Sequence, residues 1–341
     1  MRSIVRRGAW IKNAKLMLVV VTMTLILPLS LFSAGQAETG SGETFEFSLG
    51  HVGSIDDVRH TAAQMFADAL KEKTGGRATV TIYPASQLGS YEEMEEGLQM
   101  GTIDIVLESI GTLSRYSPVA GIESMPFLFL DKDHYLRVWE GDIGQEIIKK
   151  IADEANFLVI GHLFRGAREL TSNVEVHSAA DLKGLKIRVS PMKERLITWQ
   201  VLGASPTPMA FGEVFTALDQ GIIDAQENPV DTILANSLHE VQDYLILTSH
   251  MSNGYTFIFN NKTFNDLPAD IQKALRESIK VAEEWFNNYI ATETANIIKQ
   301  LEEGGMTVIR PDIESFRVLG AEVIKEFPDL KLYYDRIQQV K

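Results

Sequence analysis

An arginine in the middle of a short predicted strand carries the first chemical signal in this sequence. The stretch "GLKIRVSP" (184–191) alternates apolar residues with Lys186 and Arg188 and ends at a proline. A charged side chain in a strand of an α/β chain is either solvated or paired. A guanidinium also presents two parallel donors that match the two oxygens of a carboxylate. We expect Lys186, nearer the strand start, to be solvated.

Catalytic motifs are absent or wrongly arranged. The sequence contains no GxxxxGK[ST], HExxH or GxSxG pattern. The stretch "SPMK" (190–193) and the stretch "KTG" (73–75) resemble elements of the penicillin-recognising serine enzymes, but their order is reversed and no SDN element is present. Pro191 also suits a strand end better than a helix start that bears a nucleophile. We predict that the protein is not an enzyme.

The sequence also does not indicate a metal site or thiol chemistry. His51, Asp56, Asp57 and His60 are close in sequence, but their spacing fits no standard ligand pattern. One of the two aspartates is expected to cap the helix that follows. The chain has no cysteine, which excludes disulfides, thiolate catalysis, Cys-ligated zinc and a lipid anchor on cysteine. We expect no metal and no cofactor.

The N-terminal residues have the pattern of a secretory signal peptide. A basic region precedes an apolar run (16–32), and "SAGQA" (33–37) supplies small residues for cleavage. The alternative is a membrane anchor, but the run is at the short limit for spanning a bilayer and contains Pro28. We predict that residues 1–37 are removed and that the mature protein is periplasmic, or outside the cell.

The charge balance limits the classes of partner. The 341 residues carry a formal charge of −14, and removal of the five basic residues in 1–37 changes it to −19. A surface of this sign argues against nucleic acid and anionic membranes as partners. A small anionic ligand remains possible where a few cations converge in a buried site.

The predicted elements form two α/β sets followed by long helices. The first set has strands at 45–51, 77–84 and 102–109 and helices at 57–73 and 91–100, an order that predicts a parallel sheet. The second set starts near residue 157. Its predicted strands lie at 157–164, 169–173, 185–190, 222–228 and 254–261, and its helices at 192–202, 211–221 and 230–238. A helix over 268–303, about 50 Å long, could lie across two domains, and another covers 312–326.

Several segments together resemble one protein family. They are "GHLFRGARELTSN", "SAADLKGLKIRVSP", "LGASPTPMAFGEVFTAL", "QGIIDAQENP" and, earlier in the chain, "YPASQLGSYEEMEEGLQMGTIDI". Over most of residues 43–310 the chain is similar to the solute-binding proteins of tripartite ATP-independent periplasmic (TRAP) transporters, the DctP-type family. The resemblance implies a two-domain α/β periplasmic-binding-protein fold with crossing strands and a long helix spanning both domains. We place the first domain at 43–165 plus about 254–290, and the second at 166–253 plus about 291–335.

The resemblance also implies where a ligand binds. The family's central arginine, which forms a bidentate salt bridge with the ligand carboxylate, corresponds to Arg188. The second family arginine, in "GxRxxTSN", corresponds to Arg168, although Arg165 could take this role. Asn228 in "QENP" corresponds to an asparagine that binds the same carboxylate, and it could equally cap the following helix.

Further site residues follow from the same resemblance. Phe211 corresponds to an aromatic residue that packs against the ligand, or it is ordinary core. Glu108 corresponds to an acidic position that some sialic-acid-binding members use for ligand hydroxyls, or it is the structural partner of an arginine. We expect His51, Gln87 and Tyr91 to complete the first-domain side of the site.

Departures from the family pattern narrow the range of possible ligands. Sialic-acid-binding members carry an asparagine near the end of the first strand, where this chain has "GHVGS", and an acidic residue where this chain has Ser90 and Tyr91. The remaining polar set suits the hydroxyls of a sugar acid, a hexuronate or an aldonate. The alternatives are a C4-dicarboxylate, another 2-oxo or 2-hydroxy acid, and a module that serves a membrane sensor. We expect a monomer that closes around its ligand and delivers it to TRAP membrane subunits.

Overall fold

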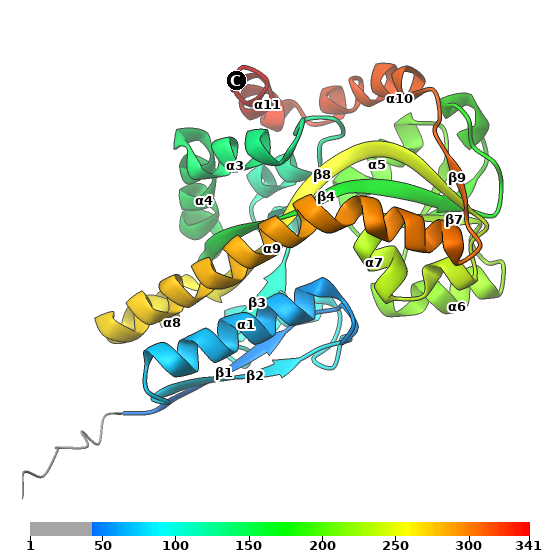
Figure 1. The fold of residues 1–341 in the computed structure, drawn as a ribbon. Coiled ribbons are helices and arrows are strands. Elements are labelled where there is room, and N and C mark those ends of the chain that lie inside the picture. Colours follow the sequence, from blue (N-terminus) through cyan, green and yellow to red (C-terminus); the bar gives the residue numbers. More distant parts are fainter. Residues whose placement is uncertain (1–42) are drawn as a thin grey trace, which may run out of the picture. The chain divides into compact units, whose positions relative to one another are not determined.

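The computed structural model describes residues 43–341, which form one compact unit. The predicted signal peptide lies outside these residues. Strands and helices alternate along much of the described chain, and the helices pack around one mixed sheet (Figure 1). None of the helices in 43–341 is long and apolar enough to cross a membrane.

The sheet has nine strands, in the order β2-β1-β3-β8-β4-β7-β5-β6, with β9 paired to β8. Their bounds are β1 Phe45–Gly50, β2 Ala78–Tyr83, β3 Ile105–Glu108, β4 Phe157–Ser172, β5 Lys186–Val189, β6 Ser205–Pro208, β7 Ala225–Pro229, β8 Tyr244–Asn260 and β9 Thr307–Ile309. The β1, β2 and β3 strands are parallel, and so are β5, β6 and β7. The parallel arrangement predicted for the first set is therefore confirmed, and the second group is parallel as well.

Two long antiparallel strands join the parallel groups. The β4 strand has 16 residues and β8 has 17, and their register runs from Phe157↔Asn260 to Ser172↔Tyr244. The register shifts at three points, and glycines with φ of +82° and +79° (Gly161 and Gly166) lie at two of them. Positive φ is a conformation that glycine adopts without steric cost, and bulges of this kind bend and twist a strand. The two strands cross the middle of the fold as one ribbon (Figure 1).

Some of the helices begin at a residue whose side chain caps them. Their bounds are α1 Val58–Lys73, α2 Tyr91–Met100, α3 Lys132–Glu140, α4 Asp142–Ala155, α5 Lys193–Val201, α6 Val214–Asp219, α7 Val230–Ala235, α8 Asn261–Asp266, α9 Ala269–Glu303, α10 Ile313–Gly320 and α11 Lys331–Ile337. Asp57 caps α1 by accepting a hydrogen bond from the Arg59 backbone N–H at 2.9 Å. Ser90 and Glu93 form a reciprocal capping box at the start of α2. These caps fix where α1 and α2 begin.

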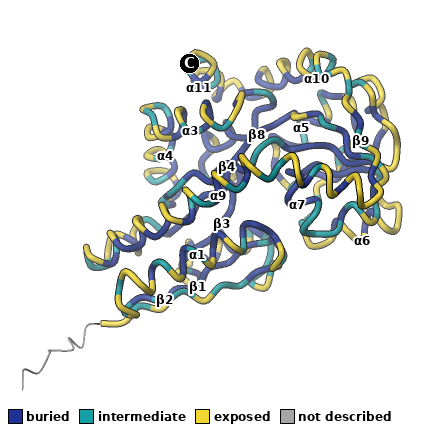
Figure 2. Tube along the Cα trace, in the orientation of Figure 1, coloured by how far each residue is buried: buried dark blue, intermediate teal, exposed yellow. Residues whose placement is uncertain are grey.

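The long helix α9 packs against two separate hydrophobic clusters. Its earlier residues, such as Ile279 and Phe286, belong to the core that also contains β1, β3 and α1. Its later residues Ile297 and Leu301 belong to the cluster under α6 and α7. One face of α9 is buried and the other is exposed (Figure 2). The helix thus ties the two ends of the fold together, as its length indicates.

The predicted elements differ from the observed ones in several places, and β6, β9 and α11 were not predicted at all. The strands predicted at 157–164 and 169–173 are one continuous strand, β4. The strand predicted at 254–261 is the second half of β8, which begins at Tyr244. Helices α3 and α4 fall in a stretch for which we predicted no element.

Candidate ligand-binding site

Five buried arginines surround one polar cavity. They are Arg59, Arg165, Arg168, Arg188 and Arg195. The other lining residues are Val52, Tyr91, Glu108, Ser109, Thr112, Ser190, Met192, Phe211, Asn228 and Thr232. Several of them lie at or just beyond the carboxyl ends of β3, β5 and β7. Open α/β sheets bind ligands in this position, because strand ends and the loops after them converge there. We call this space the inner cavity.

Arg188 lies on β5 and is 2% exposed. Its Nε and Nη2 donate to the Met209 carbonyl at 2.9 and 2.7 Å, which leaves its other N–H groups for a further partner. Burial lowers the pKa of Arg188 to about 10, with Glu227 opposing that shift, so the side chain stays charged at neutral pH. Among residues 43–341, no carboxylate lies within salt-bridge distance of it. Lys186, two residues earlier, is exposed as predicted.

Arg168 is held by a carboxylate of the protein itself. Its Nε and Nη2 both donate to the carboxylate of Glu227, the latter at 2.9 Å, and Nη2 also donates to Asn228 Oδ1 at 2.8 Å. Arg195 Nη1 reaches the same carboxylate at 3.1 Å, and His250 Nε2 lies 3.1 Å from it. Burial would raise the pKa of Glu227, but the two arginines outweigh it and hold the pKa well below its usual range. Glu227 is therefore an anion that two cations share.

Arg165 and Arg59 lie against a single aromatic ring. Each guanidinium carbon is 3.9 Å from the ring centroid of Tyr255. Arg165 Nη2 donates to Thr232 Oγ1 at 3.1 Å, and the part of the chain that the structure describes offers it no salt-bridge partner. Burial lowers the pKa of Arg165. Between Arg165 and Arg168, the side chain without a carboxylate partner is Arg165.

Glu108 pairs with an arginine that the sequence analysis did not select. Its Oε2 accepts from Arg59 Nη1 at 2.7 Å, and both side chains are buried. Its Oε1 accepts from the Ser109 backbone N–H at 3.1 Å. The structural role considered for Glu108 is thus present, although its side chain also lines the inner cavity. The cavity wall at Glu108 is an internally neutralised ion pair.

Two of the predicted residues, His51 and Gln87, do not line the inner cavity, whereas Tyr91 does. His51 is fully buried, with its Nε2 3.2 Å from His60 Nδ1. Burial, Arg59 and His60 together lower the pKa of His51 to about 2. Gln87 is exposed, in a loop whose backbone folds back on His51 through the Ser86 N–H.

The inner cavity contains groups that the sequence analysis missed. Arg59 and Arg195 lie in the first turns of helices α1 and α5, and neither follows a recognisable spacing from Arg188. Thr112, Ser109, Ser190 and Met192 come from loops and short helices. In residues 43–341, no group of three or more His, Asp or Glu side chains could hold a metal ion. The arginines that line the cavity make the arrangement suited to binding an anion.

The fold and the buried cationic cavity together define a solute-binding protein. Residues 49–329 match the family described as bacterial extracellular solute-binding protein, family 7, to which this chain belongs. Proteins of this family are solute-binding proteins that serve transport.

Three similar proteins are either named for a ligand or were solved with one bound. The chain is 32% identical to the sialic acid-binding periplasmic protein SiaP of Vibrio cholerae, over 82% of this chain and 87% of the relative. It is 33% identical to the 2,3-diketo-L-gulonate-binding periplasmic protein YiaO of Escherichia coli K12, over 91% and 98%. A TRAP periplasmic solute-binding protein from Roseobacter denitrificans, solved with bound L-galactonate, superposes with a TM-score of 0.81 at 31% identity, covering 86% of this chain and all of that one. This neighbour confirms the predicted fold class.

Proposed function

We propose that this protein captures a sugar acid anion, a hexuronate or an aldonate, for a TRAP transporter. The observation that carries the proposal is the buried, charged Arg188, which lines a polar cavity and has no carboxylate partner among the described residues. An uncompensated buried charge is costly, and a ligand carboxylate would neutralise it. A guanidinium edge matches such a carboxylate bidentately. Asn228, beside it in the cavity, supplies a further amide.

The polar remainder of the inner cavity favours hydroxyls over a second carboxylate. Tyr91, Ser109, Thr112 and Ser190 each bring a hydroxyl to the wall. Two similar proteins point the same way, since YiaO is named for a diketogulonate and the Roseobacter neighbour holds a galactonate.

A C4-dicarboxylate is the second candidate. It is supported by one observation, the absence of a salt-bridge partner for Arg165 in the described part of the chain, which offers a second cation to a second carboxylate. In this reading Arg165, rather than Arg168, is the second ligand arginine.

The mechanism we propose is closure of two domains around the anion. The ligand carboxylate binds Arg188 and Asn228, and the wall formed by Arg59, Glu108 and Tyr91 then closes over the hydroxyl end. Exclusion of water strengthens the charge-assisted hydrogen bonds. The same proposal includes domain boundaries near residues 165, 253 and 290. It also includes export by a cleaved signal peptide and delivery of the ligand by a monomer to membrane subunits. A fall in the radius of gyration on ligand addition, measured by X-ray scattering, tests closure.

A thermal-shift screen tests the ligand class. Hexuronates, aldonates and C4-dicarboxylates are each added to the purified mature protein. A ligand at a hundredfold excess over its dissociation constant stabilises the folded state by about 2.7 kcal/mol, so a true ligand raises the melting temperature by several degrees. The proposal expects a shift with a sugar acid. A shift with dicarboxylates alone would select the second candidate instead.

A further inference from the structure

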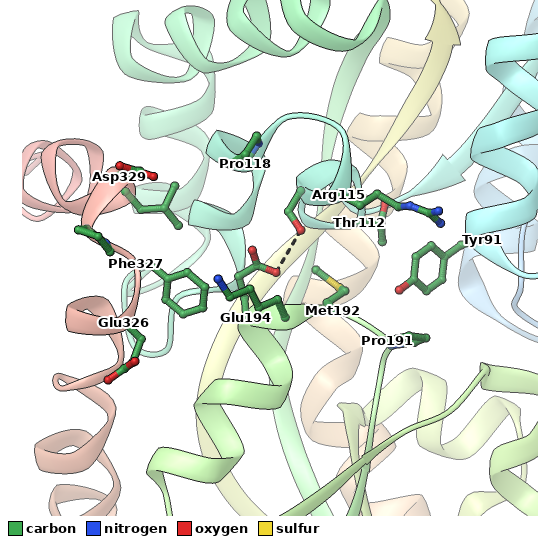
Figure 3. Close-up of a pocket in the computed structure, with 14 residues that line it drawn as sticks. Tyr91, Thr112, Arg115, Pro118, Pro191, Met192, Glu194, Glu326, Phe327 and Asp329 are labelled. Atoms are coloured by element: carbon green, nitrogen blue, oxygen red, sulfur yellow. Dashed lines mark hydrogen bonds between the residues drawn. The ribbon is translucent and has the colours of Figure 1, made fainter.

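A second, larger cavity adjoins the inner cavity. It has a volume of about 350 Å³, whereas the inner cavity has about 40 Å³. Three residues line both spaces: Tyr91, Thr112 and Met192. We call the larger space the outer cavity (Figure 3). Sites for small molecules commonly have volumes of roughly 300–1,000 Å³, so the outer cavity is large enough to hold part of a ligand.

The partition between the cavities has an unsatisfied polar group. Tyr91 is 7% exposed, and its hydroxyl is buried without a hydrogen-bond partner. Figure 3 shows the hydroxyl end of this ring directed toward Met192 and Pro191, at the boundary of the two spaces. Buried hydroxyls are nearly always hydrogen-bonded in native proteins. A ligand that passes this point would supply the missing partner, and the flexible thioether of Met192 could give way to it.

The wall of the outer cavity combines apolar faces with hydroxyl-binding edges. Pro118, Pro191 and Phe327 present apolar surfaces. The buried carboxylate of Glu194 accepts from Ser114 Oγ at 3.0 Å and keeps acceptor capacity for another hydroxyl. A sugar ring would match this wall, because its C–H faces are apolar and its hydroxyl groups form hydrogen bonds.

The charge of this wall disfavours a second anion. Two cations, Arg115 and Lys193, line it together with three acidic residues, Glu194, Glu326 and Asp329. Arg115 is already paired with Glu96 at 3.0 Å. The inner cavity gathers arginines, so the two spaces differ in sign. A ligand that filled both would be anionic at one end and neutral at the other.

We propose that the outer cavity is a second subsite, and that the natural ligand is an acid longer than a six-carbon sugar acid: an aldonate that carries a second, neutral sugar ring. The carboxylate is held at Arg188, the chain passes Tyr91, and the second ring occupies the outer cavity. This inference rests on the proposed function and specifies its ligand class.

Isothermal titration calorimetry on the mature protein tests the proposal. Gluconate is compared with cellobionate and maltobionate, and galactonate with lactobionate. We expect a disaccharide acid to bind at least tenfold more tightly than its six-carbon counterpart. A tighter or equal affinity for the six-carbon acids would overturn the second subsite and leave the sugar-acid function intact. No binding of any of these acids would overturn both.

Two variants locate the second ring. Asp329→Trp places a large side chain on the exposed edge of the outer cavity, and Glu194→Gln removes the charged acceptor. Both should weaken the disaccharide acid about tenfold and change the affinity for the six-carbon acid by less than twofold. The six-carbon acid thus reports that each variant is folded with its inner cavity intact. Equal losses for the two acids, or no loss for either, would contradict the assignment.

Discussion

The two walls of the inner cavity differ in how far their charges are neutralised. On the wall formed by the N-terminal elements, Arg59 and Glu108 neutralise each other at 2.7 Å, and Tyr91 adds an uncharged hydroxyl. The wall formed by β4, β5, β7 and α5 carries four arginines and one buried carboxylate, Glu227. Two of these arginines share Glu227, and the other two, Arg165 and Arg188, have no salt-bridge partner among residues 43–341.

The difference indicates which end of the ligand each wall receives. Buried cations without anions are costly, so the arginine-rich wall is suited to an anion from outside. The neutral wall offers hydrogen bonds without excess charge, which suits hydroxyl groups. The ligand is therefore expected to lie with its carboxylate toward Arg188 and its hydroxyl end toward Tyr91.

Removal of the shared anion should produce the largest effect. Glu227→Gln leaves Arg168 and Arg195 buried without compensation, and breaking a buried ion pair in this way costs about 3–5 kcal/mol of stability. Glu108→Gln removes the carboxylate partner of only one arginine, Arg59, which keeps the Tyr255 hydroxyl as a partner. Urea unfolding of both variants should show the greater loss for Glu227→Gln. An equal or smaller loss would remove the distinction between the walls.

The pH dependence of stability should reveal a protonated carboxyl beside the neutral wall. Burial raises the pKa of Glu95 to about 8, with the neighbouring Thr112 hydroxyl opposing that shift. In the unfolded chain the pKa is about 4.3, so the folded protein binds the extra proton between these values. The contribution of Glu95 to the free energy of unfolding is fully present below about pH 4.3. It is lost as pH rises toward 8, by up to about 1.4 kcal/mol per pH unit.

The variant Glu95→Gln keeps the shape of this side chain without the ionisation. Its unfolding free energy should lack the Glu95 contribution to the decline between pH 5 and 8, so the difference between wild type and variant should change steadily across that window. Chemical denaturation at several pH values measures this difference. A constant difference would show that Glu95 is ionised in the folded state.

A smaller effect separates the two predicted hydroxyl-binding residues. Tyr91→Phe removes one hydroxyl from the cavity wall and should weaken ligand binding by about 0.5–1.5 kcal/mol, the net contribution of a typical hydrogen bond. Gln87→Ala should leave affinity unchanged, because Gln87 is exposed and does not line the cavity. Calorimetry with the best sugar acid checks both. An unchanged affinity for Tyr91→Phe, or a loss for Gln87→Ala, would place the hydroxyl end elsewhere.

Much of the fold was predictable because its signals are local. Helices α1, α2 and α9 begin and end within a residue or so of their predicted bounds, since capping residues, glycines and apolar periodicity mark them. The continuous β4 strand was not predictable in this way. Gly166 falls in the gap between the strands predicted at 157–164 and 169–173, although it lies at a bulge within one strand, as Gly161 does.

The site was predictable only in part, for a different reason. Arg188 was found because the residues around it resemble a family motif. The partners that decide the charge of the cavity are distant in sequence: Arg59 pairs with Glu108 across 49 residues, and Arg168 with Glu227 across 59. Such pairings depend on which strands lie side by side, and no local pattern of residues encodes them.

The central claim is that Arg188 binds the ligand carboxylate, and calorimetry on one pair of variants tests it most directly. The wild type, Arg188→Ala and the control Lys186→Ala are titrated with the sugar acid that gives the largest thermal shift. Loss of a buried charge partner typically costs 2–5 kcal/mol, so Arg188→Ala should bind about thirtyfold to several thousandfold more weakly. Lys186→Ala should match the wild type, since that side chain is exposed. Unchanged affinity for Arg188→Ala would contradict the account.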